Sequence, residues 1–481
     1  MSVYLGRLAT GLKAGGFGGE FLIVQSNGGV MSTDSACRLP VRTALSGPAA
    51  GVIAAAHIAQ TAGFDSVITG DMGGTSFDVA LIADGRSMLS AQTSIDFGMV
   101  VRSPMIEITT IGAGGGSIAW VDKGGLLNIG PESAGSTPGP VAYGQGNTRP
   151  TVTDANVVLG RIDPDRPIGG QLDRLDVAAA ARAIDQHVGT PLGLSTPAAA
   201  EAILRVANSR MAGAIRLVSI ERGFDPKRFA FMPFGGGGAL HTGAMLADVG
   251  IGRAVVPRYP GVTSAMGCVI ADMRHDFVRT INALTAALDP MALGATLRDH
   301  VDQGMALLDA AQSRFEYRDI VAELDMAYVG QTHTVVVPLP VTVQDGRAAA
   351  PSVVEIEAAF DAAYKAVYGR LLPNGARRVM NLRTAVIGRR PKFDLTTLAP
   401  TGGSVAAAHQ GSRQVHFGTQ WRDTAIYDRL MLPVGAVIHG PAILVQPDTT
   451  VLIDPGLSGR VDAFGNTIIE PGPTASEASH D

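Results

Sequence analysis

Apolar and polar positions along the chain alternate between two spacings, and turn residues separate the segments. Short apolar runs predict strands at 21–24, 66–69, 79–82, 229–232 and 254–257. Small residues and helical spacing predict helices at 4–13, 48–62, 174–223 and 242–249. In the long helical region, Ile203, Met211 and Ile215 recur at spacings that place them on one face. Strands interspersed with helices indicate an α/β fold over roughly the first half of the chain.

The pattern changes near residue 280. Helices are predicted at 290–313 and 352–368, with extended segments around 319–339 between them. This second region therefore predicts a smaller α+β domain, and the residues beyond it show little helical pattern. The predicted organisation is a first domain at 1–280, an α+β domain at 281–398, a linker at 399–412, a β-rich domain at 413–470 and a disordered tail at 471–481.

Composition excludes several classes of protein. The chain has 481 residues, of which 46% are apolar and 17% charged, so most of its length can form packed cores. A net charge of −5 argues against a nucleic-acid or anionic-membrane binder. Cys37 and Cys268 are too few for a disulfide scaffold or a thiolate metal site, and we expect both to be buried thiols. Without a signal-peptide pattern or a long apolar run, the sequence predicts a soluble cytoplasmic protein.

Glycine is the compositional outlier. There are 60 glycines, roughly one residue in eight, where about 7% is usual. They gather in five clusters, at 27–29, 70–74, 112–116, 135–146 and 235–238. Glycine tolerates positive φ and has no Cβ to obstruct an approaching group. The clusters therefore predict loops that line a binding cleft.

The most distinctive cluster lies on a predicted β-hairpin. Gly73 and Gly74 form its turn, and Asp71 and Asp78 flank them. The Gly-Lys-Ser/Thr ending of the common phosphate loop is absent from this segment. The glycine amides and the Thr75 hydroxyl can contact phosphate, while Asp71 can hold Mg²⁺ through water with Asp78 in support. The alternative is an ordinary acidic hairpin turn.

Two further glycine clusters follow strands or precede them. The run at 235–238 separates a strand from a helix, so its amides lie at a helix N-terminus and could meet an adenosine or a phosphate. A close helix–sheet crossing would also explain it. The cluster at 114–117 is either a ligand loop or a structural turn. The candidate nucleotide-binding residues in these clusters are Gly114, Gly115, Gly116, Ser117, Gly235, Gly236, Gly237 and Gly238.

Several segments, in this order, resemble the hydantoinase A/5-oxoprolinase family. Members of that family include ATP-dependent hydantoinases and lactamases and the nucleotide-handling subunit of acetone-type carboxylases. The likeness is strongest over residues 20–280 and weaker beyond them. The matching segments are QSNGGVMS (25–32), ALSGPAAGV (44–52), DMGGTSFDVALI (71–82), IGAGGGSIAWVD (111–122), GPESAGSTPGPVAYGQG (130–146), PTVTDANVVLGR (150–161), ERGFDPKRF (221–229), FGGGGALH (234–241), PGVTSAMG (260–267), YVGQTHTV (328–335) and GPAILVQPDTTV (441–452).

The resemblance implies a fold similar to actin, Hsp70 and the sugar kinases, in which ATP lies between two ribonuclease-H-like lobes. By this likeness the hairpin from Asp71 to Asp78 is the phosphate hairpin of the second lobe, and the run at 235–238 is the adenosine loop. Asp71 and Thr75 would then be catalytic, and Asp71 and Asp78 would hold the metal. Asp154 and His241 are further candidates for the cleft, unless Asp154 caps a helix and His241 packs locally at a helix start.

The function that the resemblance implies is that of an ATP-dependent amidohydrolase subunit. ATP would phosphorylate the carbonyl oxygen of a cyclic amide, and a hydantoinase B-like partner subunit, with room for another divalent metal, would assist hydrolysis. An alternative is the nucleotide-handling subunit of an acetone- or acetophenone-carboxylase-like enzyme. A second alternative is a nucleotide-binding or scaffold subunit without catalysis.

One feature departs from the family pattern. Full-length relatives begin with another Asp-x-Gly-Gly-Thr hairpin in an amino-terminal domain, whereas the segment from Asp71 to Thr75 is the only copy in this sequence. We therefore expect a separate amino-terminal lobe on another polypeptide to complete the ATP cleft. The sequence leaves open that the chain is a fragment or that nucleotide turnover has been lost.

Overall fold

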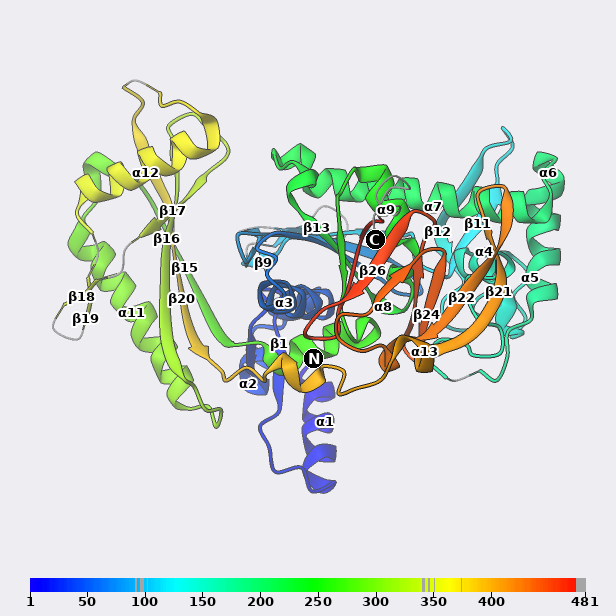
Figure 1. Cartoon of the computed structure of the whole chain (residues 1–481). Coiled ribbons are helices and arrows are strands. Elements are labelled where there is room, and N and C mark those ends of the chain that lie inside the picture. The colour runs from blue at the N-terminus through cyan, green and yellow to red at the C-terminus, as the bar shows by residue number, and fades with distance from the viewer. Residues whose placement is uncertain are drawn as a thin grey trace, which may run out of the picture. The chain divides into compact units, whose positions relative to one another are not determined.

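The computed structural model divides the chain into two compact units, each built from separate stretches of sequence (Figure 1). Unit 1 comprises Met1–Ser46, Gln92–Pro104 and Ile270–Lys392, and unit 2 comprises Gly47–Ala91, Met105–Val269 and Phe393–Asp481. The structure describes residues 1–90, 93–95, 99–101, 103–170, 172–339, 342–344, 347–349, 351–372 and 374–472. The predicted tail at 471–481 lies almost entirely outside the described residues.

Unit 1 is an α+β unit with a six-stranded sheet in the order β1-β2-β15-β20-β16-β17. Helices α11 and α12 pack on one face of this sheet (Figure 1). Its helices are α1 (Ser2–Ala14), α2 (Thr33–Arg38), α11 (Pro290–Asp309) and α12 (Val353–Tyr368). Its strands are β1 (Leu22–Val24), β2 (Val30–Ser32), β7 (Thr93–Ile95), β8 (Met99–Val101), β15 (Met273–Leu284), β16 (Tyr317–Tyr328), β17 (Val335–Leu339), β18 (Thr342–Gln344), β19 (Arg347–Ala349) and β20 (Arg377–Arg389).

The two faces of this sheet differ in chemistry because side chains alternate along a strand. On β16, Leu324 and Met326 are buried in the core beneath the helices. The intervening Glu323 and Asp325 lie on the other face, where each pairs with Arg383 of β20 at 3.1 and 3.2 Å. The apolar face therefore packs against α11 and α12, while on the other face Arg383 forms ion pairs with both acidic groups of β16.

Unit 2 is an α/β unit built on a nine-stranded sheet. The sheet follows the order β10-β4-β3-β13-β14-β27-β26-β23, and β5 pairs with β4. Its strands are β3 (Val67–Met72), β4 (Phe77–Ala83), β5 (Arg86–Ser87), β10 (Ile108–Ile111), β13 (Ala230–Phe234), β14 (Ala254–Val256), β23 (Val437–His439), β26 (Leu457–Val461) and β27 (Thr467–Pro471). Its short paired strands outside this sheet are β6 (Leu89–Ser90), β9 (Met105–Ile106), β11 (Ser117–Val121) and β12 (Leu127–Ser133).

The centre of this sheet confirms the predicted ribonuclease-H-like fold class. β3 is antiparallel to β4 and parallel to β13, and β13 is parallel to β14. Parallel neighbours require a crossover, which the helices of unit 2 provide. These helices are α3 (Ser46–Thr61), α4 (Val152–Val158), α5 (Val177–Ile184), α6 (Thr190–Leu192), α7 (Thr196–Val218), α8 (Gly235–Gly238), α9 (Thr242–Val249), α10 (Thr263–Ile270) and α13 (Val405–Ala408).

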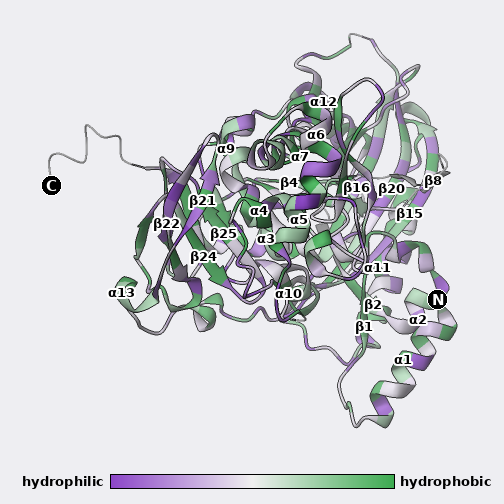
Figure 2. Ribbon diagram, turned by 90° about the vertical axis from the view of Figure 1, so that its right-hand side faces the viewer, coloured by the Kyte–Doolittle hydropathy of each residue, from purple (hydrophilic) through white to green (hydrophobic). Residues whose placement is uncertain are grey.

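A second sheet of unit 2 has the order β21-β22-β24-β25. Its strands are β21 (His409–Phe417), β22 (Gln420–Asp428), β24 (Ala442–Gln446) and β25 (Thr449–Ile453). Figure 2 shows β22 as largely hydrophilic and β24 as hydrophobic, and every residue of β25 is buried. One half of the sheet, β21 and β22, is therefore largely exposed to solvent, and the other half, β24 and β25, is largely buried.

The structure differs from the sequence predictions at four places. The predicted first domain at 1–280 is not one unit, because Met1–Ser46 and Gln92–Pro104 belong to unit 1. The segment 399–412, predicted as a linker, contains α13 and the start of β21, and Ala408 is buried. The predicted β-rich domain does not stand alone, because β23, β26 and β27 complete the nine-stranded sheet. Cys268 is exposed on α10 and Cys37 is half-buried, so the expectation of two buried thiols is wrong for Cys268.

Candidate functional site

The predicted hairpin is formed by β3 and β4 of unit 2. The register pairs Asp71 with Asp78 and Met72 with Phe77, and the Gly73 N–H donates to the Ser76 carbonyl at 3.2 Å. Gly73, Gly74 and Thr75 form an exposed tip. Among the described residues, no backbone carbonyl accepts from the N–H groups of Gly74 or Thr75. Two amides and the Thr75 hydroxyl are thus available to an anion at this tip.

Two carboxylates face one another behind the tip. Asp71 and Asp78 are directly opposite across the antiparallel pair, and like charges in such positions repel. Burial, followed by the charge of Asp78, raises the pKa of Asp71 to about 6. Burial also raises the pKa of Asp78 above its ordinary value. In the described part of the chain, no lysine or arginine forms an ion pair with either carboxylate.

Three hydroxyl groups hydrogen-bond to these carboxylates. Ser264 Oγ, on the first turn of α10, donates to Asp71 Oδ2 at 3.4 Å. Thr110 Oγ1 donates to Asp78 Oδ1 at 2.6 Å, and Ser76 Oγ donates to Asp78 Oδ2 at 3.3 Å. The sequence reasoning missed Ser264 and Thr110. Ser264 falls within the PGVTSAMG segment that carries the family resemblance, which was the one available indication of its role.

The glycine run at 235–238 lies beside Asp71, as the candidate site requires. β13 is in register with β3, so that Phe234 pairs with Asp71 and Gly235 follows directly. A Cβ on Gly235 would come within 2.5 Å of Asp71 Oδ1 and of the Met72 carbonyl, and Gly235 has a φ of +76°. The run forms α8 and is not an open loop. Its remaining glycines, Gly236, Gly237 and Gly238, pack over the end of β3 or toward β25.

The cluster at 114–117 has a different role from the one that the phosphate hypothesis assigned to its amides. Gly115 N–H donates to the Gly73 carbonyl at 3.0 Å, and Gly116 N–H donates to the Gly74 carbonyl at 2.6 Å. Ser117 N–H donates to the carbonyl of Gly114 at 3.1 Å. The amides of Gly115 and Gly116 therefore brace the hairpin tip, the amide of Ser117 closes its own loop, and none of the three is free for a phosphate. The structural-turn alternative describes this loop.

Asp154 supports this brace and does not face a cleft. It is fully buried, and its carboxylate accepts from the N–H groups of Val141, Ala142 and Thr151 at 2.7 to 3.1 Å and from Thr151 Oγ1 at 2.8 Å. Thr151 and Asp154 form the capping box of α4. Thr153 N–H, on the same turn, donates to the Gly115 carbonyl at 2.8 Å. The helix-cap alternative is therefore the one that the geometry favours.

Replacing Asp154 by alanine should lower the free energy of unfolding by about 3 kcal/mol, because four donors lose a charged acceptor in the protein interior. Urea denaturation of the variant measures the change. Nucleotide affinity at the hairpin should fall only indirectly, through loosening of the loop at 114–117 that hydrogen-bonds to the hairpin tip. An unchanged unfolding midpoint would show that the capping box contributes nothing.

His241 is likewise engaged within the unit. Its Nδ1 lies 2.6 Å from Asn208 Oδ1 on α7, and the residue is 3% exposed. Burial, with a smaller effect of Arg161, lowers the pKa of His241 to about 3, so the imidazole is neutral at physiological pH. This geometry agrees with a locally packed histidine at a helix start.

The acidic pair fits a divalent cation. Mg²⁺ in proteins is usually held by one or two carboxylates together with water and substrate phosphates. Asp71 and Asp78 supply two carboxylates without a cationic partner beside a tip that has free amides. The described residues contain no group of three or more His, Cys, Asp or Glu side chains placed to hold a metal. The donor set therefore suits a metal whose other ligands come with a phosphate chain.

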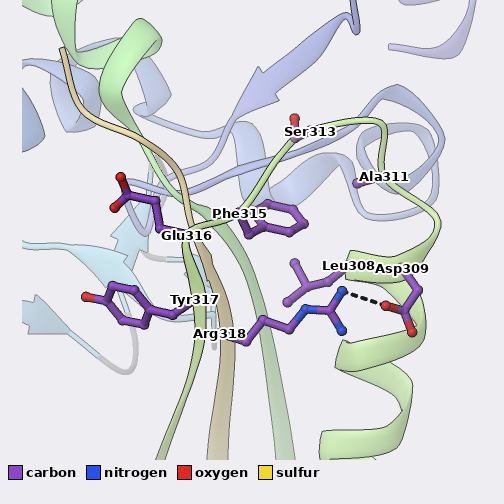
Figure 3. A pocket seen from close by; sticks show the side chains of 8 residues that line it. All are labelled: Leu308, Asp309, Ala311, Ser313, Phe315, Glu316, Tyr317 and Arg318. Carbon is purple, nitrogen blue, oxygen red and sulfur yellow. Dashed lines mark hydrogen bonds and ion pairs between the residues drawn. The ribbon is translucent and has the colours of Figure 1, made fainter.

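A cavity in unit 1 does not share this chemistry. It has a volume of about 390 Å³ and is lined by a single segment, 308–318, where α11 leads into β16. Figure 3 shows Asp309 and Arg318 pairing, at 2.6 Å, while Glu316 and Tyr317 point away from the pair. Because the facing charges neutralise one another, we assign this cavity no part in the site.

Unit 2 is a ribonuclease-H-like lobe with an acidic glycine hairpin at the ends of its central strands. The hydantoinase/oxoprolinase family model matches residues 1–277, and the model of the hydantoinase/oxoprolinase C-terminal domain matches residues 293–469. The chain belongs to the hydantoinase/oxoprolinase family.

Individual relatives have named functions. The chain is 34% identical to the caprolactamase subunit alpha of Pseudomonas jessenii, over 93% of this chain and 64% of the relative. It is 33% identical to the acetophenone carboxylase gamma subunit of Aromatoleum aromaticum, over 97% of this chain and 65% of the relative. The crystal structure of the ATP-dependent caprolactamase from Pseudomonas jessenii matches with a TM-score of 0.81 and 33% identity, over 98% of this chain and 69% of that one.

The chain thus spans about two thirds of the length of these relatives.

Across the described residues, no helix has both the length and the hydropathy that a membrane span needs.

Proposed function

We propose that the chain is the nucleotide-binding subunit of an ATP-dependent amidohydrolase that opens a cyclic amide. The observation that carries this proposal is the convergence of Asp71, Asp78, the exposed tip at Gly74 and Thr75, and the backbone of Gly235 in one place. The names of the caprolactamase relatives support the hydrolytic reaction and the dependence on ATP.

The residues have distinct parts in this proposal. The N–H groups of Gly74 and Thr75 and the Thr75 hydroxyl bind phosphate oxygens, because they are exposed at the tip and have no partner in the hairpin. Asp71 and Asp78 hold Mg²⁺, which neutralises phosphate charge when it is bound. Gly235 leaves room for the Asp71 carboxylate, since a Cβ there would lie 2.5 Å from Asp71 Oδ1, and the nucleotide lies beside Gly236, where a Cβ would come no closer than 3.7 Å to another atom. Asp71 and Thr75 are thus the proposed catalytic residues.

The braces act through the hairpin and touch no ligand. Gly115 and Gly116 fix the carbonyls of the tip, and the capping box of α4 fixes the loop that carries them. A rigid tip holds its free amides in place before the ligand arrives, so less ordering free energy is lost on binding.

Partner chains belong to the proposal. The relatives carry subunit names, and the hairpin tip offers only the free amides of Gly74 and Thr75 to the oxygens of a triphosphate. We propose a hydantoinase B-like subunit for the hydrolytic step and an amino-terminal lobe with a second phosphate hairpin, on this polypeptide or another.

An ATPase assay with the assembled complex tests this function. With a cyclic amide such as caprolactam or 5-oxoproline present, ATP hydrolysis should rise and ring-opened amino acid should form in proportion. No turnover with every partner present would count against the proposal. A carboxylase subunit is the second candidate, favoured by the acetophenone carboxylase relative, and it would require ATP hydrolysis that depends on bicarbonate and a ketone.

Affinity for Mg²⁺ should fall about tenfold between pH 7.5 and pH 5, because the pKa of Asp71 of about 6 leaves most of this carboxyl protonated at pH 5. Calorimetric titration of MgCl₂ into the chain at the two pH values measures the change. The Asp71→Asn variant should bind weakly at both. A wild-type affinity that is the same at pH 5 and pH 7.5 would remove Asp71 from the metal site.

A further inference from the structure

A cavity of about 660 Å³ opens in unit 2 between α7, α9 and the turns that follow β21 and β25. Leu204, Ile251 and Phe417 contribute apolar wall, and Arg161, Glu201 and Asp454 contribute charge. Such a combination of apolar surface and a few polar groups is typical of small-molecule sites.

This cavity is separate from the nucleotide site. Thr449 Oγ1, at the start of β25, donates to the Gly236 carbonyl at 3.1 Å, whereas Asp454 directly follows the other end of β25. A strand rises about 3.3 Å per residue, so the two ends of β25 are roughly 15 Å apart. A ligand in the cavity would not touch the hairpin.

The charges of Arg161 and Glu201 satisfy one another. Arg161 Nη2 donates to both carboxylate oxygens of Glu201, at 3.0 and 3.2 Å. His416 Nδ1 and the Gly418 N–H each lie 3.1 Å from Glu201 Oε1. Arg161 is only 7% exposed and lies over the Phe417 ring. This pair therefore offers neither a free cation nor a free carboxylate to a ligand.

Asp454 has no such partner. In the described part of the chain no other residue donates a hydrogen bond to its carboxylate, and no cation lies within ion-pair distance. Burial raises the pKa of Asp454 to about 6, so the group is mainly ionised at pH 7.5. A Cβ on Gly243 would come within 2.0 Å of Asp454 Oδ2, so a glycine on the first turn of α9 makes room for the carboxylate.

The charged side chains that line the cavity therefore sum to −1: Arg161 cancels Glu201, the exposed Arg205 and Asp248 are opposite in charge, and Asp454 remains. An unpaired carboxylate beside apolar surface is costly unless a cation joins it. An anion would be repelled, and a neutral apolar molecule would leave the carboxylate unpaired.

We propose that this cavity binds a small organic ammonium ion, whose charge pairs with Asp454 and whose apolar chain contacts Leu204, Ile251 and Phe417. The charge-assisted hydrogen bond to the carboxylate fixes the ammonium end, and burial of the chain supplies the remaining affinity. This site stands on different residues from the nucleotide site, and either can fail alone.

Calorimetric titration of the full chain at pH 7.5 with n-pentylammonium chloride tests the proposal. The ammonium should bind at least tenfold more tightly than sodium pentanoate and n-pentanol, which match its chain with a negative or neutral end. Absence of ammonium binding, or equal binding of the three probes, would overturn it.

Three variants test whether Asp454 binds the ammonium group. Asp454→Asn should weaken ammonium binding at least tenfold, whereas Asp248→Asn, which changes an exposed carboxylate lining the same cavity, should change it less than about twofold. Ala247→Leu enlarges an exposed side chain of α9 that lines the cavity and should likewise weaken binding at least tenfold without unfolding the protein. Wild-type affinity in the folded Asp454→Asn variant, or in Ala247→Leu if Asp454→Asn does not fold, contradicts the assignment.

Discussion

Replacing Asp71 by asparagine should reduce ATP turnover by the assembled complex at least a hundredfold while leaving the fold intact. The asparagine side chain would occupy the same volume but could not supply the charge that holds Mg²⁺ near the hairpin tip. Steady-state ATPase kinetics of the wild-type and variant complexes measure the loss. A hundredfold loss corresponds to about 3 kcal/mol of transition-state stabilisation.

The stability of this variant follows from the same pKa. The pKa of Asp71 is about 6 in the folded protein against an ordinary value of 3.8, so folding disfavours the ionised form and stability falls as pH rises between these values. The Asp71→Asn variant should therefore be at least as stable as the wild type at pH 7.5 without metal. Asp84→Asn is the matched control, because Asp84 lies in the exposed turn after β4 at a φ of 50°, which asparagine tolerates. A variant that hydrolyses ATP like the control would show that Asp71 has no part in turnover.

Replacing Gly114 by alanine should lower the free energy of unfolding by about 3 kcal/mol. The added Cβ would lie 2.6 Å from Ser76 N and from the carbonyl carbon of Thr75, both of which are backbone atoms of the hairpin tip. The tip and the loop would have to separate, which would break the bonds from Gly115 and Gly116 to the tip carbonyls. Nucleotide affinity should fall with stability, because the same tip presents the free amides.

Gly73→Ala gives the matched control on the other side of this contact. A Cβ on Gly73 would meet no atom within 4 Å, and its φ is not in the left-handed region. Urea denaturation of the two variants compares them, and the control should lose less than about 1 kcal/mol. Equal stability of Gly114→Ala and the wild type would mean that the loop does not brace the hairpin as described.

The sequence predicted the arrangement within the hairpin, but it did not predict which distant segments contact the hairpin. The hairpin was recognisable because Asp71 and Asp78 lie on strands joined by a glycine turn, and a turn of that length fixes which residues face each other. The contribution of Ser264 depends on a helix 193 residues further along the chain, and no local pattern indicates which side chain will reach Asp71. The sequence of its segment pointed to a resemblance but not to a contact.

The glycines at 114–116 show the same limit. Their clustering correctly indicated that another group approaches the backbone closely. That group is the tip at Gly73 and Gly74, where a phosphate had been expected. Composition cannot distinguish the two, because both demand an absent side chain and available amides.

The larger organisation followed similar rules. The α/β character and most helices of unit 2 were predictable from periodicity, as α3 and α7 illustrate. The joining of β27 to β14 in one sheet was not, since these strands lie more than two hundred residues apart and pair only through tertiary packing. Likewise, β2 and β15 join distant stretches into unit 1.

In the proposed function, the hairpin from Asp71 to Asp78 binds a magnesium–triphosphate. A crystal structure of the chain with its partners, Mg²⁺ and a non-hydrolysable ATP analogue tests it most directly. We predict metal density at Asp71 and Asp78, with phosphate oxygens within hydrogen-bond distance of the Gly74 and Thr75 amides. A nucleotide bound elsewhere, with neither carboxylate near metal or phosphate, would contradict the account.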